Sequence, residues 1–391
     1  MKLSAGNTYR MMAATLAIVL LGASVPKVKG QDDANDRQLR FEVMPLAGSD
    51  LEAFENGAVP PGSPSLKMWK YTATSTRSGS VGKKYTGYMV GNSPFTTNGT
   101  TTTTVYVVPL IVQIGAVTFD PTKADAACYG GIVPLDALKT SPMVMTWHDF
   151  KINGIDVGST QYSDAFQRAN FWKEVSGKGG TYHNKLNYKY LAPVTIAPSA
   201  AISNLYSTPG LCTAQYGGIE VNAFDTILKL LIPGLGPLGV NPGNLVTFML
   251  YNVTLYDTTP TNCCIGGYHG AYGAPVQTYS PFQYDTAGFF GTAGMDTAIM
   301  SHEINEWQDD PLGNNPTPAW GHVGQVSGCQ TNLEVGDPLS GTDLPAIKLL
   351  TLPYHLQELA FYSWFYGGPS LGAGGKYSDH GTFTKAQGKC S

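Results

Sequence analysis

Runs of apolar and β-branched residues predict the strands of this chain. Residues 105–114 (VYVVPLIVQI) form the strongest run. Pro109 inside it indicates an edge strand or a bulge, because proline cannot donate a ladder hydrogen bond. Residues 186–196 and 245–256 have a similar apolar character and are also predicted to be strands.

Helical spacing of apolar positions appears between these strands. Residues 163–175 predict a helix with Ser163 or Asp164 as its N-cap. Residues 224–232 predict a shorter helix that Pro233 terminates. Strands and helices that share one region in this way predict a single α+β domain.

The first thirty residues have the pattern of a secretory signal peptide. Lys2 and Arg10 precede a mostly apolar stretch at 11–25, and small residues lie just before a cleavage position at Gln31. The stretch is short for a bilayer span, so an uncleaved anchor is the less favoured alternative. We expect a secreted protein, extracellular or periplasmic, without stable membrane insertion after cleavage.

The remaining chain divides in composition near residue 104. Residues 31–104 are rich in Ser, Thr, Gly and Pro without sustained periodicity, which predicts a flexible arm or a propeptide. Residues 105–391 then form the α+β domain, and the 46 glycines and 26 prolines of the chain predict that it is loop-rich.

Charged residues are scarce, and the net charge is slightly negative. Charged residues make up 13% of the chain, about half of the usual share. The net charge of −4 becomes −8 when residues 1–30, with four basic and no acidic residues, are removed. Because nucleic-acid binding requires a basic excess, this composition excludes a nucleic-acid partner.

Six cysteines in an exported chain predict disulfides rather than thiols. They are Cys128, Cys212, Cys263, Cys264, Cys329 and Cys390. Cys263 and Cys264 are adjacent, so we expect them to pair with different partners. Their spacings do not match the C-x-x-C arrangement of a thiolate zinc site.

Residues 295–311 (MDTAIMSHEINEWQDDP) carry the most informative pattern. They predict a helix capped by Asp296 and ended by Pro311. His302 and Glu306 lie one turn apart on one face, with Glu303 next to His302. This is the spacing of the H-E-x-x-H zinc helix, in which the first and fifth positions bind metal and the second-position Glu accepts a proton from bound water.

A polar helix face offers a simpler interpretation, in which His302 and Glu306 only hydrogen-bond each other and a loop. A metal site needs a third protein ligand, and the turn at 332–338 (NLEVGDP) supplies Glu334 and Asp337. Either carboxylate could bind the metal while the other orients His302. Asp309, seven residues after His302, lies on the same helix face and could also support a ligand.

A glycine-flanked segment before this helix contains Tyr268 and His269. We expect a loop here, from which either side chain could donate a hydrogen bond to a developing oxyanion. The alternative is a turn pinned by a disulfide and filled by an aromatic ring.

These motifs together resemble those of secreted bacterial proteins related to the plant EXORDIUM, or phosphate-induced, family. The resemblance rests on residues 301–306 (SHEINE) with Asp310-Pro311, on 334–337 (EVGD) and on Gly267-Tyr268-His269, with further likeness at 158–172. It covers residues 105–390 in patches.

The resemblance implies a zincin-like, metalloprotease-like domain with a mixed sheet and an active-site helix. His302 and Glu306 would bind Zn²⁺, Glu303 would be the base, and Asp337 or Glu334 would complete the site. Glu306 stands where well-understood proteolytic zincins have His, and this second carboxylate could favour Ca²⁺. The expected substrate is a peptide or cell-wall material; the alternative function is non-catalytic binding of extracellular polysaccharide or calcium.

Overall fold

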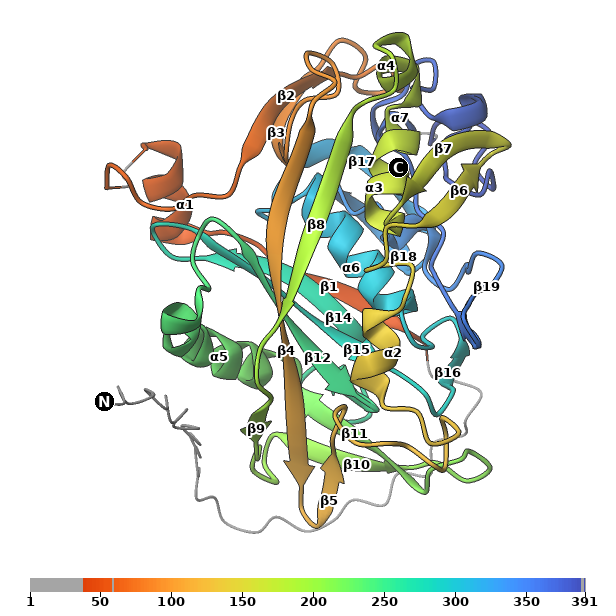
Figure 1. Cartoon of the computed structure of the whole chain (residues 1–391). Helices are drawn as coiled ribbons and strands as arrows, with labels where there is room; N and C mark the ends of the chain where they lie inside the picture. Colours follow the sequence, from red (N-terminus) through yellow and green to blue (C-terminus); the bar gives the residue numbers. More distant parts are fainter. Residues whose placement is uncertain (1–37, 58–59, 388–389, 391) are drawn as a thin grey trace, which may run out of the picture.

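One large mixed sheet with helices on both faces organises the protein (Figure 1). The computed structural model describes residues 38–57, 60–387 and 390, so the predicted signal peptide lies outside the described residues. The sheet is built from β1 (Arg40–Met44), β4 (Thr100–Ile114), β5 (Val117–Phe119), β8 (His183–Tyr190), β9 (Val194–Ile196), β10 (Ser203–Ser207), β11 (Gln215–Glu220), β12 (Leu245–Tyr251), β13 (Val253–Tyr256), β14 (Cys263–Tyr272) and β15 (Gln277–Tyr284).

The strand order is β10-β11-β13-β14-β15-β12-β4-β5, with β1 beside β14 and with β8 and β9 beside β4. β12 runs parallel to both of its neighbours, β15 and β4, whereas β14 is antiparallel to β15 and β13. The prediction of an α+β fold with a mixed sheet is confirmed.

Short hairpins and helices surround the sheet. The hairpins pair β2 (Met68–Thr74) with β3 (Lys84–Val90), β6 (His148–Ile152) with β7 (Ile155–Thr160), β17 (Pro316–Val323) with β18 (Val326–Asn332), and β19 (Ile347–Leu349) with β20 (Leu352–Tyr354). Strand β16 spans Phe289–Thr292. The helices are α1 (Gly48–Glu55), α2 (Pro134–Lys139), α3 (Tyr162–Asn170), α4 (Trp172–Gly177), α5 (Val221–Leu231), α6 (Ala298–Asp309) and α7 (Tyr362–Tyr366), with 3-10 turns η1 (Ile232–Leu238), η2 (Asp337–Leu339) and η3 (Ala373–Gly375).

Two hydrophobic cores lie on opposite faces of the sheet. Every residue of β12 is buried. Leu245 and Met249 belong to the core under α6 and α3, whereas Phe248 and its neighbours Val246 and Leu250 belong to the core under α5. This alternation explains why β12 reads as a continuous apolar run, since both of its faces are covered. None of the helices in the described ranges has the length and apolarity to cross a membrane.

Residues 38–104 do not form a loose arm, contrary to the expectation from their composition. β1 pairs in parallel with β14, with Val43 opposite His269, and β2 and β3 form a hairpin. The predicted domain boundary at 104/105 falls inside β4, where Thr101 and Thr103 are buried and alternate with exposed threonines. Polar β-branched residues therefore continue the strand that apolar residues predicted only from position 105.

Several predicted elements are interrupted. The helix predicted at 163–175 is two helices, α3 and α4, separated by Phe171. The strand predicted at 245–256 divides into β12 and β13 at Asn252, whose φ is 51°. The strand predicted at 186–196 divides likewise into β8 and β9. Such breaks depend on single backbone angles, which hydrophobic periodicity does not encode.

Pro109 lies in an interior strand rather than at an edge. β4 pairs with β12 up to Pro109 and with β8 up to Val107, and its pairing with β9 begins at Leu110. The proline therefore occupies the point where the neighbours of β4 change, so its missing N–H leaves little of the ladder unpaired.

The cysteines form disulfides, as predicted, in the pairs Cys128–Cys212, Cys263–Cys264 and Cys329–Cys390. The expectation that adjacent Cys263 and Cys264 have different partners is wrong. All six cysteines are therefore paired, and none of the disulfides links β14 to another segment.

Candidate metal centre

Helix α6 is buried along its whole length. Met300, Ile304 and Trp307 pack into the hydrophobic core, as their spacing predicted. The expected cap is different, because Asp296 accepts hydrogen bonds from both the backbone N–H and the ring of His355 and makes no cap bond to α6. The polar face of α6 is covered by β14 and by the turn that leads into η2.

Three predicted ligands converge on this polar face. Nε2 of His302 lies 3.1 Å from Oε2 of Glu306 and 3.5 Å from Oδ1 of Asp337. The side chains are at most 8% exposed. Ligand atoms at about 2.0–2.2 Å from one zinc ion in a tetrahedron are roughly 3.3–3.6 Å apart, so the observed spacing fits a shared cation.

His269 brings a second group of predicted residues together. Its Nδ1 lies 3.7 Å from Oε2 of Glu303 and 3.6 Å from Oε2 of Glu306, and its Nε2 lies 3.9 Å from Oε2 of Glu334. His269 is in strand β14, not in the expected loop. The preceding residue, Tyr268, points to the opposite face of the sheet and donates to Asp225 of α5.

Backbone amides hold one oxygen of Glu306. Its Oε1 accepts hydrogen bonds from the N–H groups of Gly336, at 2.9 Å, and Asp337, at 3.3 Å. Its Oε2 therefore remains directed at the two histidines. This arrangement fixes the carboxylate in the position that a metal ligand requires.

Glutamines orient the other two ligands. Oε1 of Gln357 lies 3.1 Å from Nδ1 of His302, and Nε2 of Gln357 donates to the carbonyl of Gly336. The carboxylate of Asp337 accepts from Gln325 and Gln330, at 2.5 and 3.1 Å. None of these glutamines was predicted from the sequence, because an amide side chain has no characteristic spacing from the ligand that it supports.

Strand β1 forms another part of the site that the sequence did not predict. The ring of Phe41 stacks on that of His302, with centroids 3.5 Å apart and planes 10° apart. The amide of Gln325 bonds both the backbone N–H and the backbone carbonyl of Phe41. Gln325 thus joins β1 to Asp337.

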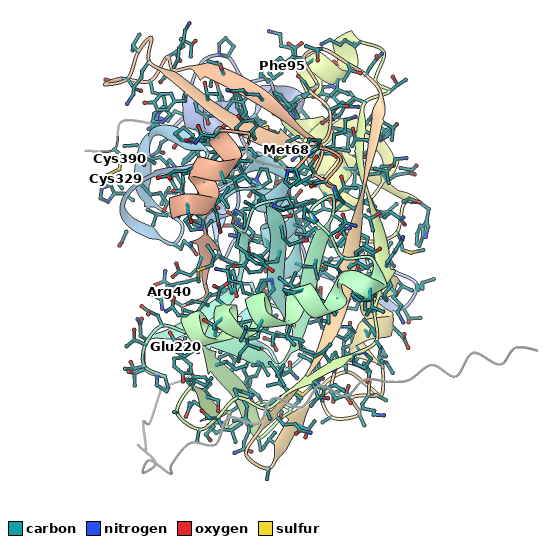
Figure 2. All side chains as sticks on the ribbon, turned by 90° about the vertical axis from the view of Figure 1, so that its left-hand side faces the viewer. Arg40, Met68, Phe95, Glu220, Cys329 and Cys390 are labelled. Atoms are coloured by element: carbon teal, nitrogen blue, oxygen red, sulfur yellow. A yellow bond between two sulfur atoms is a disulfide. The ribbon has the colours of Figure 1, made fainter. Side chains whose placement is uncertain are left out.

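A cavity of about 320 Å³ reaches the carboxylates from the surface. Its walls come from β1 and β18, and Glu306, Glu334 and Asp337 line its buried part. Arg40 and Cys329, which also line it, lie along the same side of the molecule (Figure 2). His269, His302 and Glu303 do not line the cavity, which weighs against the expected oxyanion contact of His269.

The buried carboxylates are costly to ionise in the ion-free protein. Burial raises the pKa of Glu303 and Glu334 well above 4.5, and burial with the charge of Glu306 raises that of Asp337 to about 6. Burial also opposes ionisation of Glu306, but the charge and hydrogen bond of His302, with the contributions of His269 and Glu334, together outweigh it and lower the pKa of Glu306. A cation in the cluster would reverse the penalty on all four carboxylates.

The two histidines differ in protonation. Burial lowers the pKa of His269 to about 4, so its ring is neutral at pH 7. Burial also acts against charge on His302, but Glu306 and Asp337 outweigh it and raise its pKa. A proton on His302 therefore takes the place that a cation would fill, and metal binding would release it.

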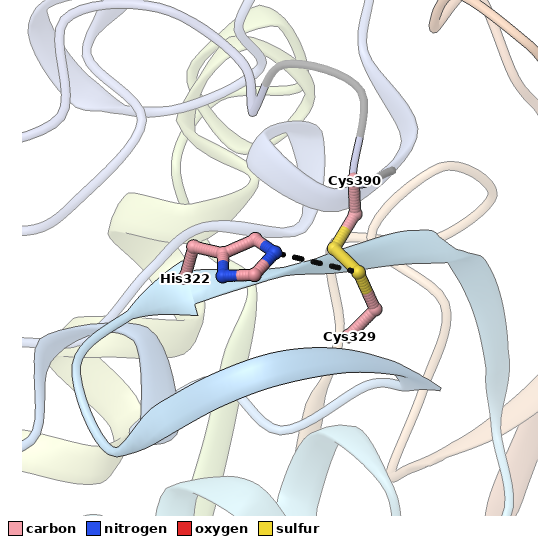
Figure 3. A group of neighbouring side chains, drawn as sticks. All are labelled: His322, Cys329 and Cys390. Carbon is pink, nitrogen blue, oxygen red and sulfur yellow. Dashed lines mark hydrogen bonds between the residues drawn. A yellow bond between two sulfur atoms is a disulfide. The ribbon is translucent and has the colours of Figure 1, made fainter.

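Other candidate ligands lie outside this cluster. Asp309, a predicted support residue, accepts from Gln167 and Asn170 of α3 and so anchors α6 to α3. Nε2 of His322 lies 3.8 Å from Sγ of Cys329 (Figure 3). That sulfur is bonded to Cys390, so it has no thiolate to offer a metal.

Comparisons with protein-family models, with curated proteins and with solved structures found no significant match to this chain. Its function is therefore inferred from the site itself.

Proposed function

We propose that this protein is a secreted, metal-dependent hydrolase of the metallopeptidase type, with one divalent cation held by His302, Glu306 and Asp337. The observation that carries the proposal is the convergence of three buried ligand atoms beside a cavity. Nε2 of His302 lies 3.1 Å from Oε2 of Glu306 and 3.5 Å from Oδ1 of Asp337. Zn²⁺ fits an imidazole nitrogen better than Ca²⁺, which prefers oxygen ligands alone.

The donor set fits a cation because three acceptor atoms face one another, with Gln325 donating to Oδ1 of Asp337 from outside the set. Nε2 of His302 is buried and has no hydrogen-bond geometry to a partner, although Oε2 of Glu306 is 3.1 Å away. With Nδ1 donating to Gln357, this nitrogen presents a lone pair to two carboxylates. Such an arrangement is repulsive unless a proton or a cation lies between the atoms.

A bound cation would polarise a substrate carbonyl and acidify a water molecule. Asp337 is the third ligand in this proposal, because Glu334 contacts His269 rather than His302. Glu303 is the base: neither of its oxygens has a hydrogen-bond partner, so its carboxylate is free to accept a proton. The cavity beside β1 and β18 admits the substrate, for which a peptide is our proposal.

Membership of a zincin-like group related to the EXORDIUM family, and secretion, belong to the same proposal. Three disulfides support an oxidising environment such as the extracellular space or periplasm. The alternative of a polysaccharide-binding module has less support, because Trp147 alone among the six tryptophans is largely exposed.

Metal analysis of the purified mature chain tests the proposal. We expect stoichiometric zinc in the wild type and its loss in His302→Ala. His355→Ala is the matched control, since it removes a histidine bonded to Asp296 away from the cluster. Glu303→Gln should keep metal on His302, Glu306 and Asp337 but lose hydrolysis of a peptide library. A folded wild type that binds no metal would refute the proposal.

A further inference from the structure

We propose that the cluster binds a second divalent cation, held by His269 and Glu303 and bridged to the first by Glu306. This inference rests on the proposed function for the first ion and adds a site to it. The two groups of ligand atoms, His302–Glu306–Asp337 and His269–Glu303–Glu306, each lie within 4.8 Å, and Glu306 belongs to both.

The geometry places Oε2 of Glu306 between the two histidines. It is 3.1 Å from Nε2 of His302 and 3.6 Å from Nδ1 of His269. Both distances match two ligands of one ion, and they involve different histidines. One carboxylate oxygen can therefore contribute to two neighbouring cations, while Oε1 stays on the backbone amides of Gly336 and Asp337.

Unpartnered polar atoms point to a ligand at the second position. His269 is fully buried, and neither of its ring nitrogens has a partner with good hydrogen-bond geometry, although the backbone carbonyl of Asp310 lies near the ring. Both oxygens of Glu303, also fully buried, lack one. A structure rarely leaves a buried imidazole and a buried carboxylate without partners, because each costs about 1–3 kcal/mol or more. A cation between Nδ1 of His269 and Oε2 of Glu303 would satisfy both.

Charge balance favours two ions over one. The cluster contains four buried carboxylates, from Glu303, Glu306, Glu334 and Asp337. Within the described part of the chain, their ion pairs are with His269 and His302 alone. With one divalent ion, two of the carboxylates must keep a proton or stay unbalanced in a buried site, whereas two divalent ions balance all four in their ionised form.

The second ion changes the role of Glu303. As a ligand, Glu303 shares a lone pair of Oε2 with the cation and becomes a weaker base, so the second ion withdraws the base that the one-ion centre uses. Hydrolysis is then expected to rise with the first equivalent of metal and to fall as the second site fills.

Titration of the metal-free full-length mature protein with Mn²⁺ tests the second site, with bound metal counted after gel filtration. We expect two ions per chain in the wild type and an electron paramagnetic resonance spectrum of exchange-coupled Mn²⁺. His269→Ala and the milder His269→Gln should bind one ion and show the spectrum of isolated Mn²⁺. Tyr268→Phe, the adjacent residue on the opposite face of β14, should still bind two.

The outcomes separate the two proposals. One ion per chain in the wild type at saturation would refute the second site and keep the first; no ion would refute both. Two ions in folded His269→Gln would refute the assignment of His269. Zinc titration of the wild type tests the role of Glu303, because full hydrolysis with two zinc ions bound would show that Glu303 is not withdrawn.

Discussion

The side-chain amide of Gln357 determines which nitrogen of His302 faces the carboxylates. Because its Nε2 donates to the carbonyl of Gly336, its Oε1 is directed at Nδ1 of His302, 3.1 Å away. Nδ1 is therefore the donor, and Nε2 is left for the cation. This pairing of a ligand histidine with an outer hydrogen-bond acceptor is a common means of fixing the tautomer.

Replacing Gln357 with Leu should weaken metal binding by about 10–100-fold, because the ring of His302 loses its tautomer and its orientation. Competition with a chelator measures the change. Gln357→Glu keeps an acceptor and should recover most of the affinity. Gln277→Leu removes another buried amide that bonds backbone carbonyls far from His302, and it should leave the affinity unchanged. Equal losses in both leucine variants would argue against the orienting role.

Replacing Gly336 with Ala should displace His302. A Cβ here would lie 2.3 Å from Nδ1 of the ring, although the backbone angles of Gly336, φ −86° and ψ −35°, suit alanine. The clash alone should cost about 1–3 kcal/mol of unfolding free energy and reduce metal affinity. Chemical denaturation and metal titration measure the two effects.

Two variants control this experiment. Gly328→Ala, at the cavity wall, adds a Cβ with no atom within 4 Å and should change little. The double variant His302→Ala/Gly336→Ala removes the clashing ring, so its loss of stability should be smaller than the sum of the single losses. Simple additivity would contradict the proposed contact.

Removing the metal should lower the melting temperature. An ion present at about 1,000 times its dissociation constant contributes about 4 kcal/mol, so a chelator should lower Tm by roughly 5–10 °C. Differential scanning calorimetry with and without chelator measures this shift. His302→Ala should melt at the same temperature in both conditions, and a chelator effect of the same size in that variant would place the ion elsewhere.

Asp379 should make stability fall as pH rises. Burial raises its pKa from 3.8 to about 7, although the hydroxyl of Tyr162 and the N–H of Leu359 act in the opposite direction. The folded state thus holds a proton that the unfolded state releases. This contribution is fully present below about pH 4 and is lost as pH rises toward 7, at up to about 1.4 kcal/mol per pH unit.

The substitution Asp379→Asn removes this titration. Urea unfolding at pH 5 and pH 7 should show that the wild type loses about 2 kcal/mol more than the variant between the two pH values. The comparison is between two differences, so groups that titrate in both proteins cancel. An identical pH dependence in the two proteins would contradict the raised pKa.

The sequence predicted the centre of the site because that part is local. His302, Glu303 and Glu306 are fixed relative to one another by the helical repeat, and Asp337 lies on a short turn that Gly336 and Pro338 signal. The sequence also indicated that His269 belongs near them, although it predicted a loop instead of strand β14.

The rest of the site depends on contacts between distant segments. Phe41 reaches His302 only because β1 pairs with β14, which lies more than 220 positions further along the chain. No pattern in the sequence of residues 31–70 predicts this pairing. Gln325 and Gln357 act through amide hydrogen bonds to distant segments, and glutamines elsewhere in the chain look the same in sequence. Asp309 shows the reverse error, because its helical position suggested the site but its partners are Gln167 and Asn170.

The turn at Gly336 and Asp337 has a consequence for the order in which the protein is made. A growing chain that ends before residue 333 already contains β14 and α6, but it lacks Glu334, Asp337 and the amides that hold Glu306. Its acidic helix face lacks Asp337, the third ligand of the proposed first ion, and the turn that covers Glu306, although His269, Glu303 and Glu306 are already present. In the proposed centre, the first cation can therefore be captured only after residue 337 has been made, whereas the ligands of the second cation are complete as soon as α6 is.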